Sequence, residues 1–427
     1  MKWKSFFIVS TLLILCFSST HCSFQKANPD LMADLNHIQM TEDGWFVTLS
    51  NTPINTISLT NDHAFGSTDY GLLHFFPLPE NPTGEILFPV SQERCLNHFV
   101  GSGTDADGNL ISRYLSIENQ SIQTKDLYCS PSNPGVEVKH PSSLSLSEYP
   151  MFSQGTIKFH FSSDVSSKTT ALAAYTNLLF ISKDSSIQKH ALRDRVFQSH
   201  LNGSTYYYLS KGTGPQSIQF NALKTAAPLD SWSYPPNPNQ PTTMTLKDAS
   251  FSDVLQRFYI AYRYDSLDQR SLQIQSYTTN GEFLQEKTIN YNPSGSFPTS
   301  SIFTFLKEKH PLLIGELFNQ GEIVCINTEG FEELWRFSID SKASVLDMMV
   351  DLTHKTMYSL LTDGSLLAIS LDHGTLIENK HIGPSMDVEY SNGSMLFYDG
   401  YAIGCLNNAV GRPYRSMFFY VSVPSVE

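Results

Sequence analysis

Histidine and cysteine, the residues that most often bind metals or act in catalysis, are scattered along this chain of 427 residues. The 13 histidines and 6 cysteines form no His-x-His, His-Glu-x-x-His or Cys-x-x-Cys pair, which are the local spacings of zinc sites. The chain also has no Gly-x-Ser-x-Gly nucleophile turn and no glycine-rich phosphate loop followed by lysine. We therefore predict no metal, no cofactor and no catalytic residue from local motifs, and a site assembled from distant residues stays open.

Three weaker candidates for chemistry have simpler structural interpretations. His98 and His160 stand among apolar residues typical of strands, where the expected role is that of a hydrogen-bonded structural histidine. Residues 105–109 (DADGN) resemble half of a calcium loop, but a third ligand and a bidentate glutamate at the required distance are missing. We interpret this segment as an acidic hairpin turn.

The first residues have the layout of a secretory signal peptide. Lys2 and Lys4 precede an apolar run at residues 6–17, and small polar residues follow. The run is shorter than the roughly 20 residues that a membrane-spanning helix needs. We predict a signal peptide at residues 1–22 and a single domain at residues 23–427, with an uncleaved N-terminal anchor as the alternative.

A lipid anchor on one of the early cysteines is disfavoured. Leu15 precedes Cys16 and His21 precedes Cys22, where lipid attachment expects a small residue. No later segment has the unbroken apolar length of a transmembrane helix. We expect a soluble, monomeric chain that is secreted or otherwise extracytoplasmic, whether in a secretory lumen, the extracellular space or a periplasm.

The composition is that of a folded, acidic protein. Hydrophobic residues make up 41% of the chain and charged residues only 16%, so a sizeable core is available. The formal net charge is −13, and lysine and arginine do not cluster. Because binding to phosphate backbones requires clustered basic residues, we exclude nucleic acid as a partner.

Residues 362–377 (TDGSLLAISLDHGTLI) carry the clearest structural pattern in the chain. Two apolar runs are each entered through a turn, at Asp363-Gly364 and at His373-Gly374. An Asp-Gly pair flanked by residues typical of strands is a strong hairpin signal, because glycine takes the positive φ that tight turns require. The stretch therefore predicts a strand, a turn and the start of another strand.

Similar pairs of hairpins recur along the chain. Gly321 and Gly364 are 43 residues apart, and Gly330 and Gly374 are 44 residues apart. A period of about 40 to 50 residues with several strands in each repeat is typical of a β-propeller. We predict an all-β propeller of four-stranded blades, with seven blades preferred and eight as the alternative. The last strands, near residues 417–423, are expected to pair beside N-terminal strands and close the ring.

The segments MYSLLTDGSLLAISLDHGTLI and GEIVCINTEGFEELW resemble the quinoprotein-type, PQQ-repeat-like β-propeller superfamily. The resemblance covers the C-terminal third, with departures at Ser370, at Ile377 and at Trp335. That superfamily includes quinone-dependent dehydrogenases and non-enzymatic scaffolds such as outer-membrane assembly lipoproteins, so the resemblance implies a fold rather than a function. Because the dehydrogenases have a vicinal Cys-Cys pair that this chain lacks, we predict no bound quinone.

A second resemblance concerns the turn from Ser370 to Gly374. The Ser-x-Asp-x-Gly pattern is similar to the Asp box of sialidases, which is a structural hairpin device. The Phe-Arg-Ile-Pro segment of that family is absent from the chain. We interpret the turn as part of the blade repeat.

Residues 231–241 (SWSYPPNPNQP) form the best candidate for a contact with a partner. We predict a proline-stiffened loop, on which Trp232 and Tyr234 are the candidate anchors for a protein or a glycan. The alternative is that Trp232 pins the loop to the blade beneath it. Three sequons provide glycosylation candidates, listed as Asn119, Asn202 and Asn392.

Four cysteines follow the predicted signal peptide. Simple pairing would join Cys95 to Cys129 and Cys325 to Cys405. We expect Cys325 and Cys405 to occupy equivalent strands two blades apart, which is too far for a disulfide, so we predict that both are buried and unpaired. Pairing of Cys95 with Cys129 stays open.

These patterns together favour a secreted, non-enzymatic β-propeller that acts as a binding or scaffold module for a protein or a glycan. The alternative is a hydrolase or lyase with its site in the central channel of the propeller.

Overall fold

Strands make up nearly all of the described chain, and many of them, such as residues 63–68, 71–76 and 356–361, are buried on both faces. The structure is a computed structural model. It describes residues 31–68, 70–78, 82–87, 96–104, 110–118, 121–130, 133–145, 160–164, 169–174, 176–181, 186–192, 196–202, 205–211, 218–224, 230–234, 244–252, 254–265, 270–291, 306–309, 311–317, 322–339, 343–383, 390–408 and 415–423. One short helix, α2 (Leu31–Leu35), precedes the strands, and no described helix has the length and apolar character needed to cross a membrane.

The strands of the described residues form eight antiparallel sheets. The first four sheets contain β3 (Ile54–Thr60), β4 (His63–Thr68), β5 (Gly71–Phe76) and β6 (Thr83–Leu87); β7 (Leu96–Thr104), β8 (Leu110–Glu118), β9 (Ser121–Ser130) and β10 (Asn133–Ser145); β11 (His160–Asp164), β12 (Thr169–Ala174), β13 (Asn177–Ile181) and β14 (Ile187–Ala191); and β15 (Val196–Asn202), β16 (Thr205–Lys211), β17 (Ile218–Lys224) and β18 (Asp230–Tyr234).

The next three sheets contain β19 (Met244–Ser252), β20 (Arg257–Asp265), β21 (Arg270–Thr278) and β22 (Phe283–Tyr291); β23 (Leu306–Lys309), β24 (Leu312–Leu317), β25 (Glu322–Asn327) and β26 (Glu333–Ser338); and β27 (Val345–Asp351), β28 (Thr356–Leu361), β29 (Ser365–Ser370) and β30 (Leu376–His381). The closing sheet contains β31 (Asn392–Tyr398), β32 (Tyr401–Asn408), β33 (Arg415–Ser422), β2 (Gly44–Ser50) and β1 (Gln39–Thr41).

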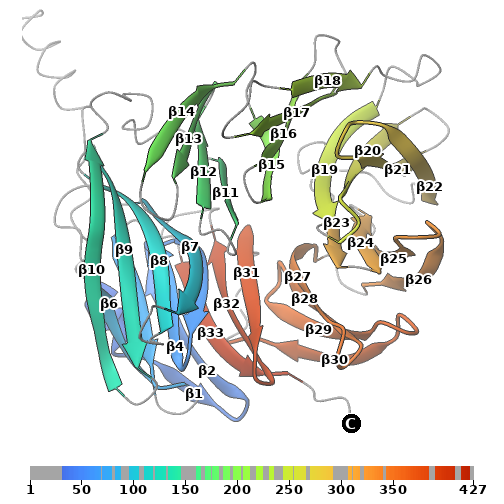
Figure 1. The fold of residues 1–427 in the computed structure, drawn as a ribbon. Helices are drawn as coiled ribbons and strands as arrows, with labels where there is room; N and C mark the ends of the chain where they lie inside the picture. The colour runs from blue at the N-terminus through green and yellow to red at the C-terminus, as the bar shows by residue number, and fades with distance from the viewer. Residues whose placement is uncertain are drawn as a thin grey trace, which may run out of the picture.

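The sheets are arranged as a ring around a central space (Figure 1). Each four-stranded sheet consists of four consecutive strands, and the first strands of neighbouring sheets contact one another: β3 contacts β7, β11 contacts β15, and β27 contacts β31. This is the β-propeller fold, and the predicted all-β class is confirmed. The eight sheets of the described residues equal the alternative blade number rather than the preferred seven, and the number of blades stays a prediction.

The ring is closed by strands from the two ends of the chain. β33 pairs with β2 in an antiparallel ladder that runs from Val421 opposite Gly44 to Arg415 opposite Ser50. Lys380 of the preceding sheet adds to this closure, because its Nζ lies 3.0 Å from an Asp43 carboxylate oxygen and donates to the Ser422 carbonyl oxygen at 3.0 Å. The predicted pairing of the last strands with N-terminal strands is confirmed.

Apolar side chains fill the spaces between neighbouring sheets. Trp45 of β2 is fully buried and stacks on Tyr420 and Phe418 of β33, with ring centroids 5.8 and 5.9 Å apart. Leu31 and Leu35 of α2 belong to the same cluster. The helix therefore covers part of the core between the closing sheet and the β3–β6 sheet.

Polar side chains join sheets where no backbone ladder can. Asn407 of the closing sheet accepts from the Ile54 amide at 2.9 Å and donates to the Ile54 carbonyl at 2.8 Å. Asp347 of β27 accepts a hydrogen bond of 2.9 Å from the Met395 amide of β31. Each contact satisfies buried backbone groups that would otherwise be costly to leave unpaired.

The two predicted turns of residues 362–377 are present. Gly364 and Gly374 have φ values of +83° and +63°, and strands β29 and β30 follow these turns. The turn at Gly374 lies against the Trp335 ring of the preceding sheet, and the Trp335 indole N–H donates to the Leu371 carbonyl at 2.6 Å. A tryptophan of the β23–β26 sheet therefore packs on a glycine turn of the next sheet along the chain.

The contact between Trp335 and Gly374 predicts a large cost for one methyl group. A Cβ on residue 374 would lie 2.7 Å from the indole ring, in addition to the strain of a positive φ. We expect Gly374→Ala to lower the free energy of unfolding by about 3 kcal/mol, the sum of left-handed backbone strain and overpacking. Gly400→Ala is the matched control, because Gly400 has a φ of +80° and no atom near the added Cβ. Equal losses for the two variants in urea denaturation would contradict this packing.

The cysteines within the described residues are free thiols. Cys129, Cys325 and Cys405 are buried and form no disulfide, so the prediction for Cys325 and Cys405 is confirmed. The expectation that the two cysteines occupy equivalent strands was wrong. Cys325 lies in the third strand of its sheet and Cys405 in the second strand of the closing sheet. Cys95 lies outside the described residues.

Burial predicts slow thiol chemistry at the two confirmed positions. It raises the pKa of Cys325 to about 12 and that of Cys405 to about 11, so the reactive thiolate is scarce at neutral pH. We expect an alkylating reagent to leave both thiols unmodified in the native protein and to label both after unfolding without a reductant. Mass spectrometry of the digested protein makes the measurement. A peptide pair joined through Cys325 and Cys405 would contradict it.

Candidate functional site

The predicted anchors Trp232 and Tyr234 lie in a strand rather than in a loop. Both belong to β18, the outer strand of its sheet, where Trp232 pairs with Phe220 and Tyr234 with Ile218. The loop prediction is therefore wrong for residues 231–234, because they pair with β17 and extend its sheet. Residues 235–241 lie outside the described residues.

The other candidates from the sequence are dispersed. Asn392 is exposed at the start of β31, Asn202 ends β15, and Asn119 lies outside the described residues. His98 and His160 lie in β7 and β11, and residues 105–109 lie outside the described residues. Within the described part of the chain, no group of three or more His, Cys, Asp or Glu is placed to hold a metal ion.

Large exposed hydrophobic side chains mark one end of four consecutive sheets. In a sheet of four consecutive antiparallel strands, the turn between the first and second strands and the turn between the third and fourth strands lie at the same end. The exposed hydrophobic side chains lie at that end. We call this set the turn-end surface, and its members are Met40, Val254, Phe283, Leu284, Leu334, Leu352, Leu376 and Ile377. They are the exposed large hydrophobic residues among those whose side-chain burial the structure describes.

The topology assigns each member to that end. Val254 and Leu352 lie in turns between first and second strands. Five other members open the fourth strands β22, β26 and β30. Met40 of β1 pairs with Trp45 at the start of β2, which is the fourth strand of the closing sheet. The surface therefore extends from the β19–β22 sheet to the closing sheet.

Three members occupy the same unusual position in successive sheets. Leu284, Leu334 and Ile377 are each the unpaired extra residue of a β-bulge in the fourth strand. Their exposed fractions are 40%, 48% and 41%. A bulge adds one residue and turns its side chain away from the regular alternation. The backbone therefore presents an aliphatic side chain to solvent at the same place three times.

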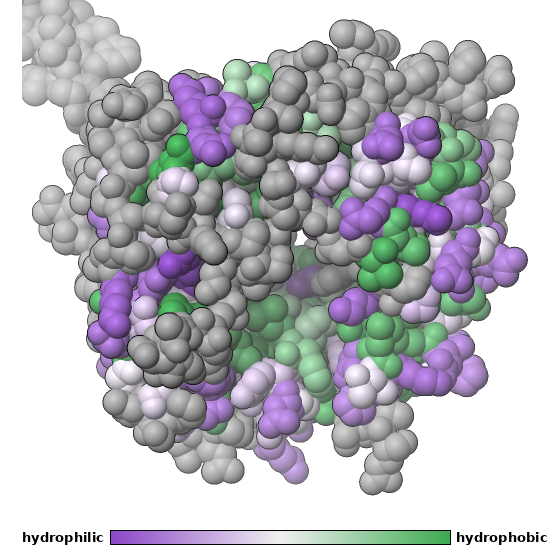
Figure 2. Space-filling view, in the orientation of Figure 1, coloured by the Kyte–Doolittle hydropathy of each residue, from purple (hydrophilic) through white to green (hydrophobic). Residues whose placement is uncertain are grey.

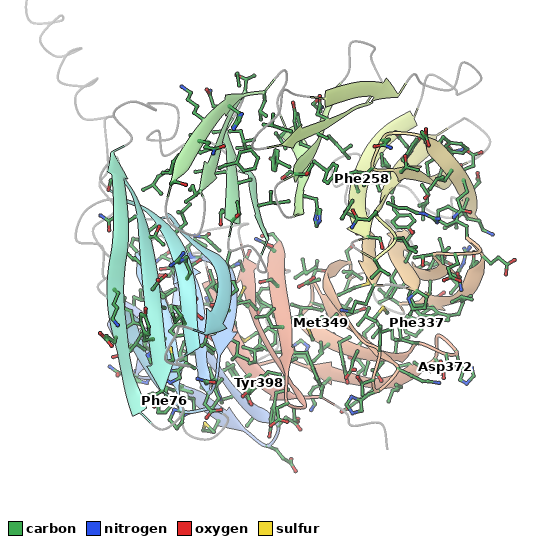
Figure 3. All side chains as sticks on the ribbon, viewed as in Figure 1. Phe76, Phe258, Phe337, Met349, Asp372 and Tyr398 are labelled. Atoms are coloured by element: carbon green, nitrogen blue, oxygen red, sulfur yellow. The ribbon has the colours of Figure 1, made fainter. Side chains whose placement is uncertain are left out.

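Ion pairs lie in the same sheets as the bulges of β26 and β30. Arg336 of β26 is 3.1 Å from Glu322 and 3.1 Å from Glu333, and Lys355 is 2.8 Å from Asp372. Figure 3 places Asp372 at the outer rim of the ring and Met349 nearer its centre. Hydrophobic and hydrophilic residues are interspersed on this part of the ring (Figure 2). Apolar residues surrounded by polar ones are typical of protein interfaces.

A shallow hollow of about 250 Å³ lies beside Leu352. Its walls come from three sheets and include Lys309, Met349, Asp351, Leu352, Tyr358 and Phe397. The Tyr358 and Phe397 rings stack with centroids 5.9 Å apart. This floor of apolar and aromatic groups suits an inserted apolar side chain.

The polar groups of the hollow are already engaged. Burial alone would raise the pKa of Asp351, but hydrogen bonds from the His354 ring at 2.6 Å and from the amides of His354 and Thr353 outweigh it and lower that pKa. Burial raises the pKa of Tyr358 to about 12, so this phenol is neutral at physiological pH. Neither group is poised as a general base near neutral pH.

Comparison with known proteins supports the fold and leaves the site to be argued from this chain. No protein-family model and no curated protein matches the sequence. Sqt1 of Saccharomyces cerevisiae is similar in structure with a TM-score of 0.54, at 11% identity over 90% of this chain and 100% of that chain.

Two further solved structures have lower scores. BamB of Moraxella catarrhalis has a TM-score of 0.46 at 13% identity and covers 90% of this chain and 100% of its own. The Cps50 (Swd1) beta-propeller domain of Myceliophteria thermophila has a TM-score of 0.47 at 10% identity, covering 77% of this chain and 97% of its own. At such identities a shared fold is all that is shown, and this chain is a β-propeller.

Proposed function

We propose that this protein is an extracytoplasmic, non-enzymatic β-propeller that binds another protein through the turn-end surface. The observation that carries the proposal is the repetition of an exposed aliphatic residue on a bulge in three successive sheets, at Leu284, Leu334 and Ile377. Large exposed apolar side chains that recur at one end of successive sheets support an interaction site there.

The chemistry of the surface favours a protein over a glycan. Sugar rings are held by flat aromatic faces and by convergent polar groups, whereas Phe283 is the one aromatic member of the turn-end surface. The remaining members are leucine, isoleucine, valine and methionine, which pack against apolar side chains of a partner. The edge strand β18, with Trp232 and Tyr234, is a second candidate contact on the same ring.

The location is proposed from the N-terminal sequence. Two lysines, the apolar run at residues 6–17 and the small polar residues after it are the support for export. The sequons at Asn119, Asn202 and Asn392 would carry glycans if the pathway is eukaryotic. The formal net charge of −13 favours a protein that stays dispersed in solution.

The binding proposal predicts site-specific crosslinking. We expect a photo-crosslinking amino acid in place of Ile377 to form an adduct with another protein, and the same group in place of the exposed Gln188 of β14 to form none. Replacing Leu284 and Leu334 together by serine should weaken the Ile377 adduct at least tenfold, because each removes an apolar contact. Thermal unfolding should change little, since both side chains are exposed.

Other crosslinking results would contradict the proposal. Equal adducts from positions 377 and 188 would show non-specific contact, and an adduct that contains only carbohydrate would favour a glycan partner. An adduct with a second copy of this chain would contradict the monomer and show self-association.

Export predicts a shortened chain. We expect protein recovered from outside the cytoplasm to begin at Ser23, because cleavage after Cys22 removes the apolar run. N-terminal sequencing makes the measurement. A chain that retains residues 1–22 and sediments with membranes would support the uncleaved anchor instead.

A further inference from the structure

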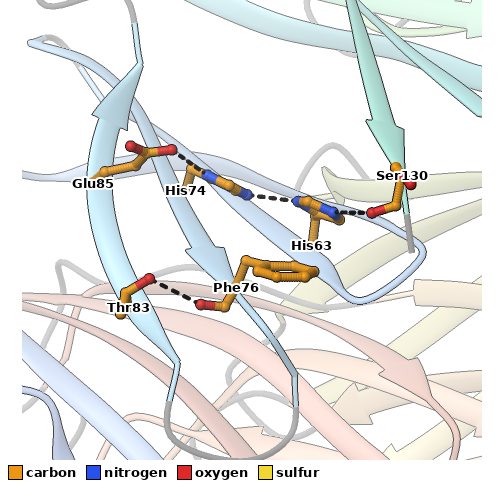
Figure 4. A network of polar contacts seen from close by, with 6 residues as sticks. All are labelled: His63, His74, Phe76, Thr83, Glu85 and Ser130. Atoms are coloured by element: carbon orange, nitrogen blue, oxygen red, sulfur yellow. Dashed lines mark hydrogen bonds and ion pairs between the residues drawn. The ribbon is translucent and has the colours of Figure 1, made fainter. Parts of the chain in front are cut away.

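Two buried histidines and a glutamate form a continuous polar chain across the β3–β6 sheet (Figure 4). His63 Nε2 lies 3.0 Å from the Ser130 carbonyl oxygen of β9, and His63 Nδ1 lies 2.7 Å from His74 Nε2. His74 Nδ1 lies 2.7 Å from Glu85 Oε1. The chain thus runs from the neighbouring sheet through β4 and β5 to β6.

The two rings are sealed from water by aromatic neighbours. His63 has no exposed surface and His74 has 2%, while the Glu85 side chain is 54% exposed. The Phe76 ring stacks on His63 with centroids 4.3 Å apart, and the Phe65 ring stacks on His74 at 5.0 Å. The two rings are therefore shielded, whereas both residues at the ends of the polar chain, Glu85 and Ser130, are exposed.

The number of protons on this chain follows from its fixed ends. The Ser130 carbonyl only accepts, so His63 carries a proton on Nε2. An ionised Glu85 also only accepts, so each of the three contacts needs one proton. Two neutral rings supply two protons in total, which leaves two lone pairs facing each other at one contact. One additional proton completes all three hydrogen bonds.

A second additional proton has the opposite effect. It would place N–H groups of both rings face to face across the 2.7 Å contact between His63 and His74. Two donors cannot share one hydrogen bond, and two buried positive charges repel each other. All three hydrogen bonds of this row of side chains therefore form in one protonation state only.

We propose that His63, His74 and Glu85 form a one-proton acid sensor, in which one shared proton completes the three hydrogen bonds and a second one breaks the contact between His63 of β4 and His74 of β5. The site lies outside the turn-end surface, and the proposal is independent of the proposed function.

The surrounding charges set the range in which the sensor responds. Burial lowers the pKa of both rings, and for His74 the positive charge of His63 would lower it further, while Glu85 raises it. Asp62, next to His63, raises the His63 pKa, and Tyr398 lies within 3.5 Å of Asp62. On β9, burial raises the pKa of Cys129 to about 12, so this thiol is neutral.

The sign of the stability effect follows from these directions. The unfolded chain binds protons on its histidines near pH 6.5, whereas the folded chain binds them at lower pH. The unfolded state therefore holds more protons below pH 6.5, and the free energy of unfolding falls as the pH falls through that range. His74→Gln, which cannot take up a proton, should make this fall shallower.

The decisive measurement is NMR of ¹⁵N-labelled histidine rings, with assignments from single variants. We expect His63 to hold its proton on Nε2 at neutral pH and His74 to become doubly protonated first, with a midpoint below 6.5. Glu85→Gln should lower that midpoint by about one pH unit, because it removes the facing negative charge. Glu85 is largely exposed, so this variant should fold.

The control is His354, an exposed histidine that makes a contact of 2.6 Å with the Asp351 carboxylate. His354→Gln should leave the His74 midpoint unchanged. An unchanged midpoint in Glu85→Gln, a His63 proton on Nδ1, or independent titration of both rings near pH 6.5 would overturn the proposal. The protection factors of amides in β4 and β5, corrected for the intrinsic pH dependence of exchange, should fall at acid pH in the wild type. Protection factors that stay constant with pH would also overturn the proposal.

Discussion

The backbone ladder between β2 and β33 is the interaction on which the rest of the ring depends. A propeller sheet is hydrophobic on both faces, so each sheet is stable only between two neighbours. The ladder joins residues near the start of the described chain to residues near its end, from Gly44 with Val421 to Ser50 with Arg415. It gives the closing sheet its full width and allows Trp45 to fill the space beside the β3–β6 sheet. Lys380 and Asn407 then add polar contacts on either side of the same closure.

The strongest local signals in the sequence predicted the corresponding parts of the fold. The pairs Asp363-Gly364 and His373-Gly374 identified real turns, because glycine at positive φ has few alternatives. The spacing of the glycines predicted the propeller, and the last strands close the ring as expected. The preferred number of seven repeats came from dividing length by period, and that arithmetic takes no account of loop length.

Features that depend on pairing between strands could not be predicted in the same way. A bulge such as that at Leu334 is defined by the register with the neighbouring strand, which the sequence of one strand does not contain. His63 and His74 are eleven residues apart and meet only because β4 and β5 are adjacent. Trp232 was assigned to a loop because of the prolines after it, whereas the residues before them alternate and extend a sheet. The sequence argument placed Cys405 in the strand equivalent to that of Cys325. Cys405 instead lies in β32, the second strand of a closing sheet that begins with β31.

The bulges in β22, β26 and β30 also bear on how this protein avoids aggregating. An outer strand of a propeller sheet has a free row of backbone donors and acceptors, which a strand from another molecule can pair with. In the closing sheet β1 covers this row. In the sheets that end with β22, β26 and β30, the extra residue of the bulge interrupts this row of free backbone groups near the start of the outer strand. A straight incoming strand would lose its register there. The irregular backbone that exposes apolar side chains therefore also restricts fibre growth along the sheet edges, and a variant that lacked the extra residues would have regular edges open to self-assembly.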